Sequence, residues 1–331
     1  MGTHQPSLPP ALKYLKEDKV TEECKDLMRS LPSTDQGFLY QYQGSWIPAF
    51  SMQGVLSFHK HFQAHDDTDI LLVTSPKVGT TWLKSILFSL LNRARYDPNA
   101  QRHPLLTNNP HKLVPFLEID LYSTKQVPDL TSFTSPRLLS THLPYSLLTR
   151  SVKDSMCKIV YLCRNPKDTF VSMWHFRNST RVNQGMNPST IEQDFDNFSK
   201  GISPYGPYWD HVMSYWKESL EKSEKVFVLE YEKMKEQPTI HLKKLAEFLE
   251  CAFSPEEEEK GVLNDILKLC SFENLSNLEV NKGGKILMVN KAALFHRGEV
   301  GDWMNHLTPE MSETLDRITE EKFHSIGLKL F

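Results

Sequence analysis

Four short apolar runs, separated by helical patterns, constrain the fold of this 331-residue chain most strongly. They span residues 69–74, 136–143, 157–164 and 225–231. Apolar runs of strand length that alternate with helical patterns are typical of a parallel sheet covered by helices. We therefore predict an α/β fold with a central parallel β-sheet flanked by helices.

Helical patterns follow these runs at about residues 81–92, from 165 to 176, at 238–250, at 254–270 and at about 308–323. Asn165 and Pro166 suit the cap and the first position of their helix. Residues 280–303 are rich in Gly and Lys and have little periodicity, so we expect a loop there.

The polar residues 1–30 predict a loosely ordered N-terminal arm. The chain shows no internal repeat and no linker, so residues 31–331 are expected to form one domain.

Composition and charge exclude several classes of function. A net charge of −3 argues against nucleic-acid binding, which needs a basic surface. No apolar run approaches the 18 residues of a membrane span, and the first residues lack the apolar core of a signal peptide. Five dispersed cysteines without a C-x-x-C pair indicate reduced thiols rather than disulfides or a zinc site. We expect a cytoplasmic protein with no membrane partner.

The stretch Ser75-Pro-Lys-Val-Gly-Thr-Thr-Trp82 directly follows the first apolar run. Gly79 allows backbone N–H groups to close on a phosphate, the following helix directs its positive end there, and Lys77 adds a cation. The Gly-Lys-Ser/Thr order whose hydroxyl binds magnesium in a Walker loop is missing. The stretch therefore predicts phosphate binding without a metal, and a metal-dependent kinase is disfavoured.

Polar residues also stand at the ends of the second and third runs. His142 is a candidate general base, and Arg164 with Ser172 is a candidate phosphate clamp. Arg164 paired with Asp168 is the alternative for the arginine. The segment 295–303 fits either a loop that closes over an anion or a surface turn.

Six blocks, in this order, resemble the cytosolic sulfotransferases: SPKVGTTW, STHLP, CRNPKDTFVSMWHF, EYEKM, LCSFENLSNLEVNK and RGEVGDW. The stretches HPLLTNNPHKLVPFLEIDLY and CSFENLSNLEVNK are most similar to the plant branch. The resemblance implies a single domain like that of the P-loop nucleotide kinases. It also implies transfer of a sulfuryl group from 3′-phosphoadenosine 5′-phosphosulfate (PAPS) to a hydroxyl of a small acceptor, without a metal.

By this resemblance His142 would be the general base, and Lys77 would stabilise the leaving phosphate. The loop at 77–81 would hold the 5′-phosphate, and Arg164 with Ser172 would hold the 3′-phosphate. The implied cofactor-binding residues are Lys77, Val78, Gly79, Thr80, Thr81, Trp82, Arg164, Ser172, Tyr231, Cys270, Ser271, Phe272, His296, Arg297 and Gly298.

Two positions depart from the family pattern. Val78 replaces the usual Ser or Thr, and the hydrogen bond of such a hydroxyl to a charged group is worth roughly 1.5–3 kcal/mol. His296-Arg297-Gly298 stands where Arg-Lys-Gly is usual, which should weaken 3′-phosphate binding above about pH 6.5. The alternative function is therefore a paralogue that binds PAPS or its desulfated form PAP with weak or no catalysis.

The acceptor class stays open between flavonoids, steroids, hydroxyjasmonates and similar molecules. Aromatic residues near the expected acceptor loops favour a flat apolar molecule, although they equally suit a core. These are Phe38, Tyr40, Trp46, Phe50, Trp174, Tyr205 and Tyr208. Met304 and Thr308-Pro309 depart from the dimerisation motif of the animal members, which favours a monomer, with a weak homodimer as the alternative.

Overall fold

A four-stranded parallel sheet forms the centre of the computed structural model, which describes residues 20–34, 37–65, 68–287, 289–324 and 326–328. The four runs predicted as strands are its four strands, in the spatial order β4-β3-β5-β6. They are β3 (Asp69–Thr74), β4 (Arg137–Thr141), β5 (Lys158–Cys163) and β6 (Val226–Glu230). Every residue of β3 and β4 is buried, as expected of strands covered on both faces.

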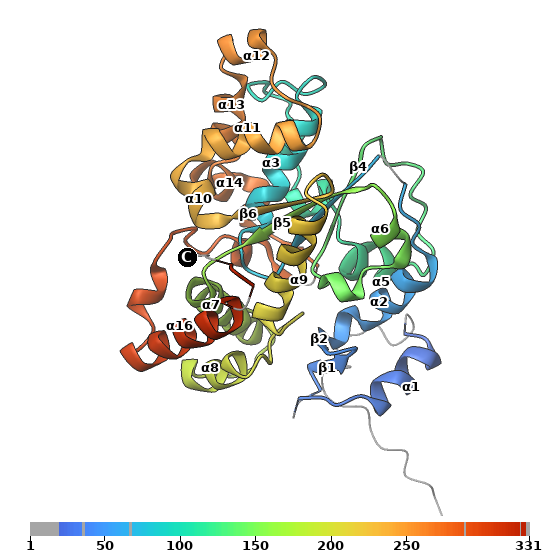
Figure 1. The fold of residues 1–331 in the computed structure, drawn as a ribbon, viewed down its shortest axis with the longest axis vertical. Coiled ribbons are helices and arrows are strands. Elements are labelled where there is room, and N and C mark those ends of the chain that lie inside the picture. The colour runs from blue at the N-terminus through green and yellow to red at the C-terminus, as the bar shows by residue number, and fades with distance from the viewer. Residues whose placement is uncertain (1–19, 35–36, 66–67, 288, 325, 329–331) are drawn as a thin grey trace, which may run out of the picture.

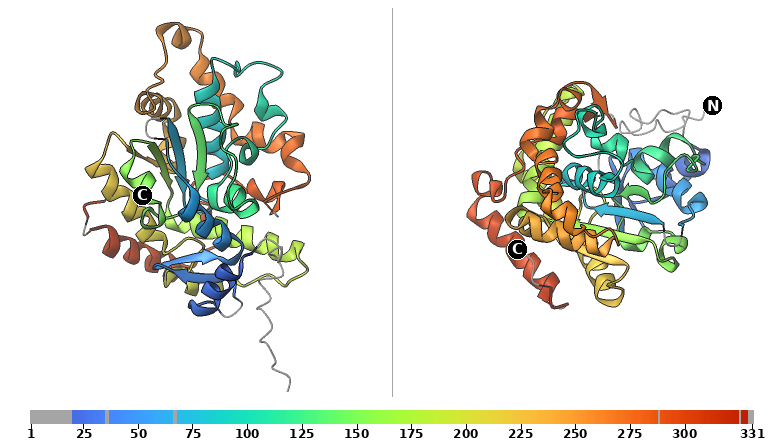
Figure 2. Two further views of the ribbon diagram at one scale, coloured as in Figure 1. Left: turned by 90° about the vertical axis from the view of Figure 1, so that its right-hand side faces the viewer. Right: turned by 90° about the horizontal axis from the view of Figure 1, so that it is seen from above.

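Helices lie on both faces of this sheet (Figure 2), and the α/β prediction is confirmed. The helices from α10 to α14 gather at the top of Figure 1, while α1, β1 and β2 lie at the lower right. The longer helices are α1 (Glu22–Ser30), α2 (Ala49–His61), α3 (Thr80–Asn92), α7 (Pro166–Asn183), α8 (Ile191–Ser199), α9 (Tyr208–Glu221), α11 (Pro238–Phe248), α13 (Val262–Leu269) and α16 (Pro309–His324).

Shorter elements complete the described part of the chain. The short α-helices are α4 (Pro110–Leu113), α5 (Tyr122–Thr124), α6 (Arg150–Asp154), α10 (Tyr231–Glu236), α12 (Pro255–Glu259), α14 (Phe272–Asn277) and α15 (Glu279–Lys282). Two antiparallel hairpins pair β1 (Leu39–Tyr42) with β2 (Ser45–Pro48), and β7 (Lys285–Ile286) with β8 (Val289–Asn290). Within the described residues no helix is long and apolar enough to cross a membrane.

Two predicted elements differ from the structure. The single helix expected over 254–270 is two helices, α12 and α13, because Gly261 adopts a left-handed conformation with φ +73° between them. A glycine in this conformation is a common helix terminator. The loop expected over 280–303 contains the β7–β8 hairpin and two 3₁₀ turns, η6 (Lys291–Leu294) and η7 (Asp302–Asn305).

The described part of the expected N-terminal arm is packed rather than loose. The Thr21 side chain caps α1 by accepting a hydrogen bond from the Cys24 N–H, and the Thr21 N–H and hydroxyl both donate to Gln53 Oε1 at 2.9 Å. Cys24 and Met28 are buried on the inner face of the helix. Residues 1–19 of the expected arm lie outside the described residues.

A buried ion pair joins the first residues of β3 and β4. Asp69 and Arg137 are register partners, and the Arg137 guanidinium donates to both carboxylate oxygens of Asp69 at 2.6 Å. Both side chains are at most 7% exposed. The pair therefore fastens the edge strand β4 to the central strand β3, at the end of the sheet opposite the candidate site.

We predict that Asp69→Ala lowers the free energy of unfolding by about 3–5 kcal/mol, because it leaves the buried Arg137 charge without its partner. Chemical denaturation measures this loss. The control is Asp154→Ala in the exposed Arg150–Asp154 pair, which should cost less than about 1 kcal/mol. Similar losses in the two variants would contradict this account of β4.

Candidate active site

The carboxyl ends of the four strands meet at one edge of the sheet, and a polar or aromatic residue follows each of them. The loop 75–79 follows β3, His142 follows β4, Arg164 follows β5 and Tyr231 follows β6. Because parallel strands end at the same edge, these segments gather there. Residues from all four line one cavity of about 1010 Å³.

The cavity collects most of the residues that the sequence singles out. Fourteen of the predicted catalytic and cofactor-binding residues line it: Lys77, Gly79, Thr80, Thr81, Trp82, His142, Arg164, Ser172, Tyr231, Ser271, Phe272, His296, Arg297 and Gly298. Val78 and Cys270 do not line it, because both are fully buried in the hydrophobic core. The Val78 side chain therefore packs in the core, and only the backbone of this residue could contact a bound phosphate.

Backbone geometry explains why position 79, in the loop between β3 and α3, is a glycine. Gly79 has φ +111°, and a Cβ there would lie 2.8 Å from Cδ2 of the Tyr231 ring. The residue directly precedes α3, whose first N–H groups have no partner within the helix. The loop thus approaches the cavity closely and presents backbone donors and the positive end of α3 to it.

Lys77 supplies a cation at this loop. Its Nζ lies 3.4 Å from the Ala293 carbonyl oxygen and 4.5 Å from the centre of the Phe176 ring. Burial, together with the neighbouring positive charge of Arg164, lowers the pKa of Lys77 to about 8. The protein alone therefore stabilises the charged form of Lys77 poorly, and an anion bound in the cavity would stabilise it.

His142 has a defined tautomer. Its Nδ1 lies 2.6 Å from the Thr74 carbonyl oxygen, which only accepts, so Nδ1 carries the hydrogen. Nε2 then has a free lone pair, and no hydrogen bond reaches it from the described residues. Burial lowers the pKa of His142 to about 3, so the ring is neutral at physiological pH. A neutral imidazole with an open nitrogen on a cavity wall is able to accept a proton.

Glu118 fixes the backbone that carries His142, and it is a residue that the sequence analysis missed. Its carboxylate accepts the His142 N–H at 2.8 Å and the Thr141 hydroxyl at 2.8 Å. The side chain is fully buried in a five-residue π-helix, Leu117–Leu121. No local pattern marks it, since its partners lie 23 and 24 residues further along the chain.

His111 is a second residue that the sequence analysis missed, and it lines the cavity. Its Nε2 lies 3.0 Å from the Thr81 hydroxyl, and its ring stacks on Phe116 with centroids 5.4 Å apart. Burial and the charge of Lys84 hold the pKa of His111 well below its usual value. The imidazole is therefore neutral and positions the Thr81 hydroxyl at the start of α3.

Arg164 has both an internal partner and an unused donor. Its Nη2 donates to the Glu299 carbonyl and lies 3.4 Å from the Asp168 carboxylate, so the pairing considered as an alternative exists. The buried Nε has no hydrogen-bond partner among the described residues. An orphaned donor on a buried guanidinium is an unsatisfied polar group, and an anion beside it would remove that cost.

The segment 295–303 is a wall of the cavity rather than an isolated surface turn. Gly298 has φ +68°, and a Cβ there would lie 2.7 Å from Cδ2 of the Phe272 ring. The Tyr231 hydroxyl donates to the Gly298 carbonyl at 2.8 Å. Asp168 holds the following residues by accepting the N–H groups of Gly301 and Trp303.

The predicted acceptor aromatics divide into two groups. Phe38, Phe50 and Tyr205 line the cavity, whereas Tyr40, Trp46, Trp174 and Tyr208 do not. The side chains of Tyr40 and Tyr208 belong to the core instead. Further apolar residues line the cavity and make one part of its wall largely apolar, among them Phe116, Ile119, Met173 and Phe176.

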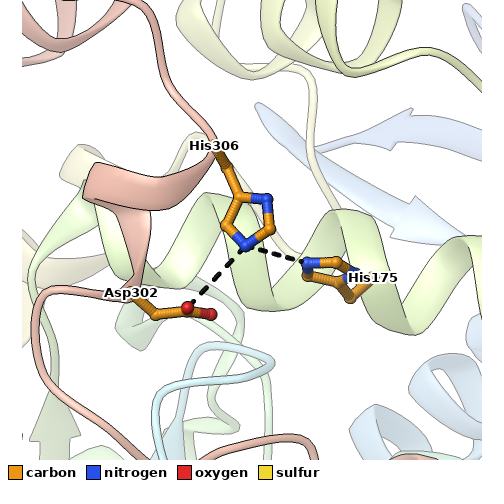
Figure 3. A group of neighbouring side chains, drawn as sticks. All are labelled: His175, Asp302 and His306. Carbon is orange, nitrogen blue, oxygen red and sulfur yellow. Dashed lines mark hydrogen bonds and ion pairs between the residues drawn. The ribbon is translucent and has the colours of Figure 1, made fainter.

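One group of described residues has the composition of a metal site. His175, Asp302 and His306 each offer one ligand atom, and these atoms all lie within 4.8 Å of one another (Figure 3). Asp302 lines the cavity, whereas His175 and His306 do not, and the group includes none of the residues predicted for phosphate binding or proton transfer.

We predict that His142 remains the neutral Nδ1–H tautomer from pH 8 down to pH 5, because its pKa of about 3 lies below this window. Nitrogen-15 NMR of the imidazole distinguishes a protonated from an unprotonated Nε2. The partly exposed His241 in α11 provides a reference signal in the same spectra. Titration of His142 near pH 6.5 would contradict the conclusion that burial keeps the ring neutral.

The comparisons with known proteins agree with this geometry. The family model described as "Sulfotransferase domain" matches residues 67–327. "Cytosolic sulfotransferase 11" of Arabidopsis thaliana is 50% identical over 320 residues, which cover 95% of this chain and 90% of that protein.

Two solved structures extend the match to the fold. A putative steroid sulphotransferase of Arabidopsis thaliana is 40% identical with a TM-score of 0.76, covering 96% of this chain and 99% of that one. Mouse sulfotransferase SULT7A1, complexed with PAP, is 27% identical with a TM-score of 0.67, covering 86% of this chain and 94% of that one. The chain belongs to the sulfotransferase family, on the branch of the plant cytosolic sulfotransferases.

Proposed function

We propose that this sulfotransferase moves a sulfuryl group from PAPS to a hydroxyl of a small acceptor, with His142 as the general base and Lys77 stabilising the leaving phosphate. The observation that carries the proposal is the cavity at the strand ends. The neutral His142, with a free Nε2, lines this cavity together with the cationic side chains of Lys77 and Arg164. A cytoplasmic location agrees with the names of the relatives.

The residues present fit a nucleotide with two phosphate groups. At one side, Lys77 and the N-terminal end of α3 suit the 5′-phosphate. At the other, Arg164 has an orphaned buried Nε, and Ser172 in α7 adds a hydroxyl on the same cavity. The mouse relative is complexed with PAP, which supports this choice of nucleotide. Trp82 and Tyr231, whose rings lie 5.4 Å apart, offer aromatic surface for an adenine.

PAPS would supply the sulfuryl group already activated by its bond to phosphate. The chain then has to position the reactants and stabilise charge, as in phosphoryl transfer. His142 Nε2 would take the proton of the acceptor hydroxyl, while Nδ1–H stays bound to the Thr74 carbonyl. Lys77 would meet the negative charge that develops on the leaving phosphate.

The acceptor is proposed to be a flat, largely apolar molecule with a hydroxyl, of the flavonoid, steroid or hydroxyjasmonate type. The support is the apolar part of the wall near His142, where Phe116 and Tyr205 lie 4.5 and 5.3 Å from the imidazole, measured between ring centroids. Rings in these positions would pack against a planar substrate and exclude water from the base.

We predict that His142→Ala lowers kcat at least 10²-fold, which is the usual contribution of a general base. The assay follows transfer from labelled PAPS to a panel of hydroxylated acceptors. His241→Ala in α11 is the control and should keep full activity, since His241 lies outside the cavity lining. Calorimetry should show that both variants bind PAP within a few-fold of the unmodified chain. Unchanged turnover in His142→Ala would contradict the role of this residue.

A chain that binds PAP but transfers nothing to any acceptor would favour the alternative, a nucleotide-binding paralogue with weak or no catalysis. The buried position of Val78 counts against this alternative, because its side chain takes no place on the cavity wall.

We also predict that PAP binding weakens as the pH rises above about 8. Lys77 has a pKa of about 8 in the free protein, so above this pH it must take up a proton to meet the phosphate. The affinity should then fall by up to about tenfold per pH unit, following the linkage of one proton to binding. Lys77→Met should bind more weakly at pH 7 and lose this dependence. An identical pH profile in the variant would contradict the assignment.

A further inference from the structure

We propose that His175, Asp302 and His306 form a binding site for a divalent transition-metal ion of the Zn²⁺ type, separate from the sulfuryl-transfer chemistry. The three side chains converge from two parts of the chain (Figure 3). His175 comes from the middle of α7, while Asp302 and His306 lie four residues apart, one in the η7 turn and the other directly after it.

Two of the three distances between the ligand atoms are close to those around a tetrahedral ion, and all three are within 4.8 Å. Bonds of about 2.0–2.1 Å between zinc and nitrogen place neighbouring ligand atoms about 3.4 Å apart in a tetrahedron. The Nε2 atoms of His175 and His306 already lie 3.4 Å apart, and His306 Nε2 lies 3.7 Å from Asp302 Oδ1. Two imidazole nitrogens that face each other share either the hydrogen of one ring or a cation, and the carboxylate beside them adds a negatively charged ligand for a cation.

The carboxylate of the group is held in place by its neighbours. Asp302 is buried, and its Oδ1 accepts hydrogen bonds from Arg297 at 2.6 Å and from Asn305 at 3.2 Å. Hydrogen bonds of this kind orient the ligands of many metal sites. Arg297 also opposes a cation by its charge, but half of its side chain is exposed, so it is free to turn toward solvent.

A third imidazole, that of His296, lies beside the group without belonging to it. The ring of His296 stacks on His175 with centroids 4.2 Å apart, and its Nδ1 lies 3.9 Å from Asp302 Oδ2. Two imidazoles and one carboxylate form a donor set typical of Zn²⁺ and Co²⁺, whereas Mg²⁺ and Ca²⁺ prefer oxygen ligands. We therefore assign the bound ion to the transition metals rather than to Mg²⁺ or Ca²⁺.

Such an ion would connect two walls of the cavity. Ser172 lies three residues before His175 in α7, and the segment 295–303 carries His296, Arg297 and Gly298. An ion on His175 and Asp302 would join this segment to α7. The proposal concerns binding alone and does not depend on the nucleotide or on the transfer reaction.

The test uses the full chain, treated with a chelator and then dialysed. Titration with Co²⁺ should give visible absorption bands of a tetrahedral ion that saturate at one equivalent, and calorimetry with Zn²⁺ should give the same stoichiometry. His175→Asn and His306→Asn should each weaken binding at least tenfold. His241→Asn, in the distant helix α11, is the matched control and should bind as the unmodified chain does.

Two results would overturn the proposal. One is binding of Zn²⁺ weaker than about 100 μM in the unmodified chain, which corresponds to less than one-tenth saturation at about 10 μM metal. The other is equal affinity in the variant that carries both substitutions. A measurement without substitutions guards against misfolded variants: the imidazole NMR signals of His175 and His306 must shift first when less than one equivalent of Zn²⁺ is added. First shifts at other histidines contradict the site.

Discussion

The parallel register of β3, β4, β5 and β6 is the constraint on which the rest of the site depends. Val73 pairs with Thr141, Thr74 pairs with Leu162, and Cys163 pairs with Glu230, so all four strands end at one edge. Parallel strands require crossover connections on the faces of the sheet, which explains the helical layers around it. At the opposite end of the sheet, the buried Asp69–Arg137 pair fastens β4 to β3.

The strand ends also explain the electrostatics of the cavity. Lys77 and Arg164 stand after neighbouring strands, and burial, together with the positive charge of Arg164, lowers the pKa of Lys77. His142 stands after β4, where the Thr74 carbonyl of β3 selects its tautomer. Under the proposed function, one side of the cavity would receive anions and His142 would accept a proton without rearrangement of the protein.

Much of this arrangement is predictable from the sequence, because buried parallel strands are continuous apolar runs and the residue after each run has a known place. His142, Arg164 and the 75–79 loop are found in this way. Glu118 and His111 are not, since they lie in short helices without a periodic pattern and their partners are far away in the sequence. The end of α12 at Gly261 is predictable, because glycine is a common helix terminator. The expected monomer stays a prediction.

Side-chain direction is the other quantity that the sequence does not supply. Val78 lies between two residues of the cavity wall, yet its side chain packs into the core. The segment after α15 folds back onto α7 and brings together His175, Asp302 and His306. No local sequence pattern predicts this contact. Packing over long sequence separations decides both cases.

A crystal structure of the chain with bound PAP tests the central claim most directly, namely that the strand ends build a clamp for two phosphate groups. The account predicts the 5′-phosphate against Lys77 and the first N–H groups of α3, and the 3′-phosphate on Arg164 and Ser172. It also predicts an open path from the 5′-phosphate to His142 Nε2. A nucleotide bound elsewhere, or a 3′-phosphate that leaves Arg164 Nε without a partner, would contradict it.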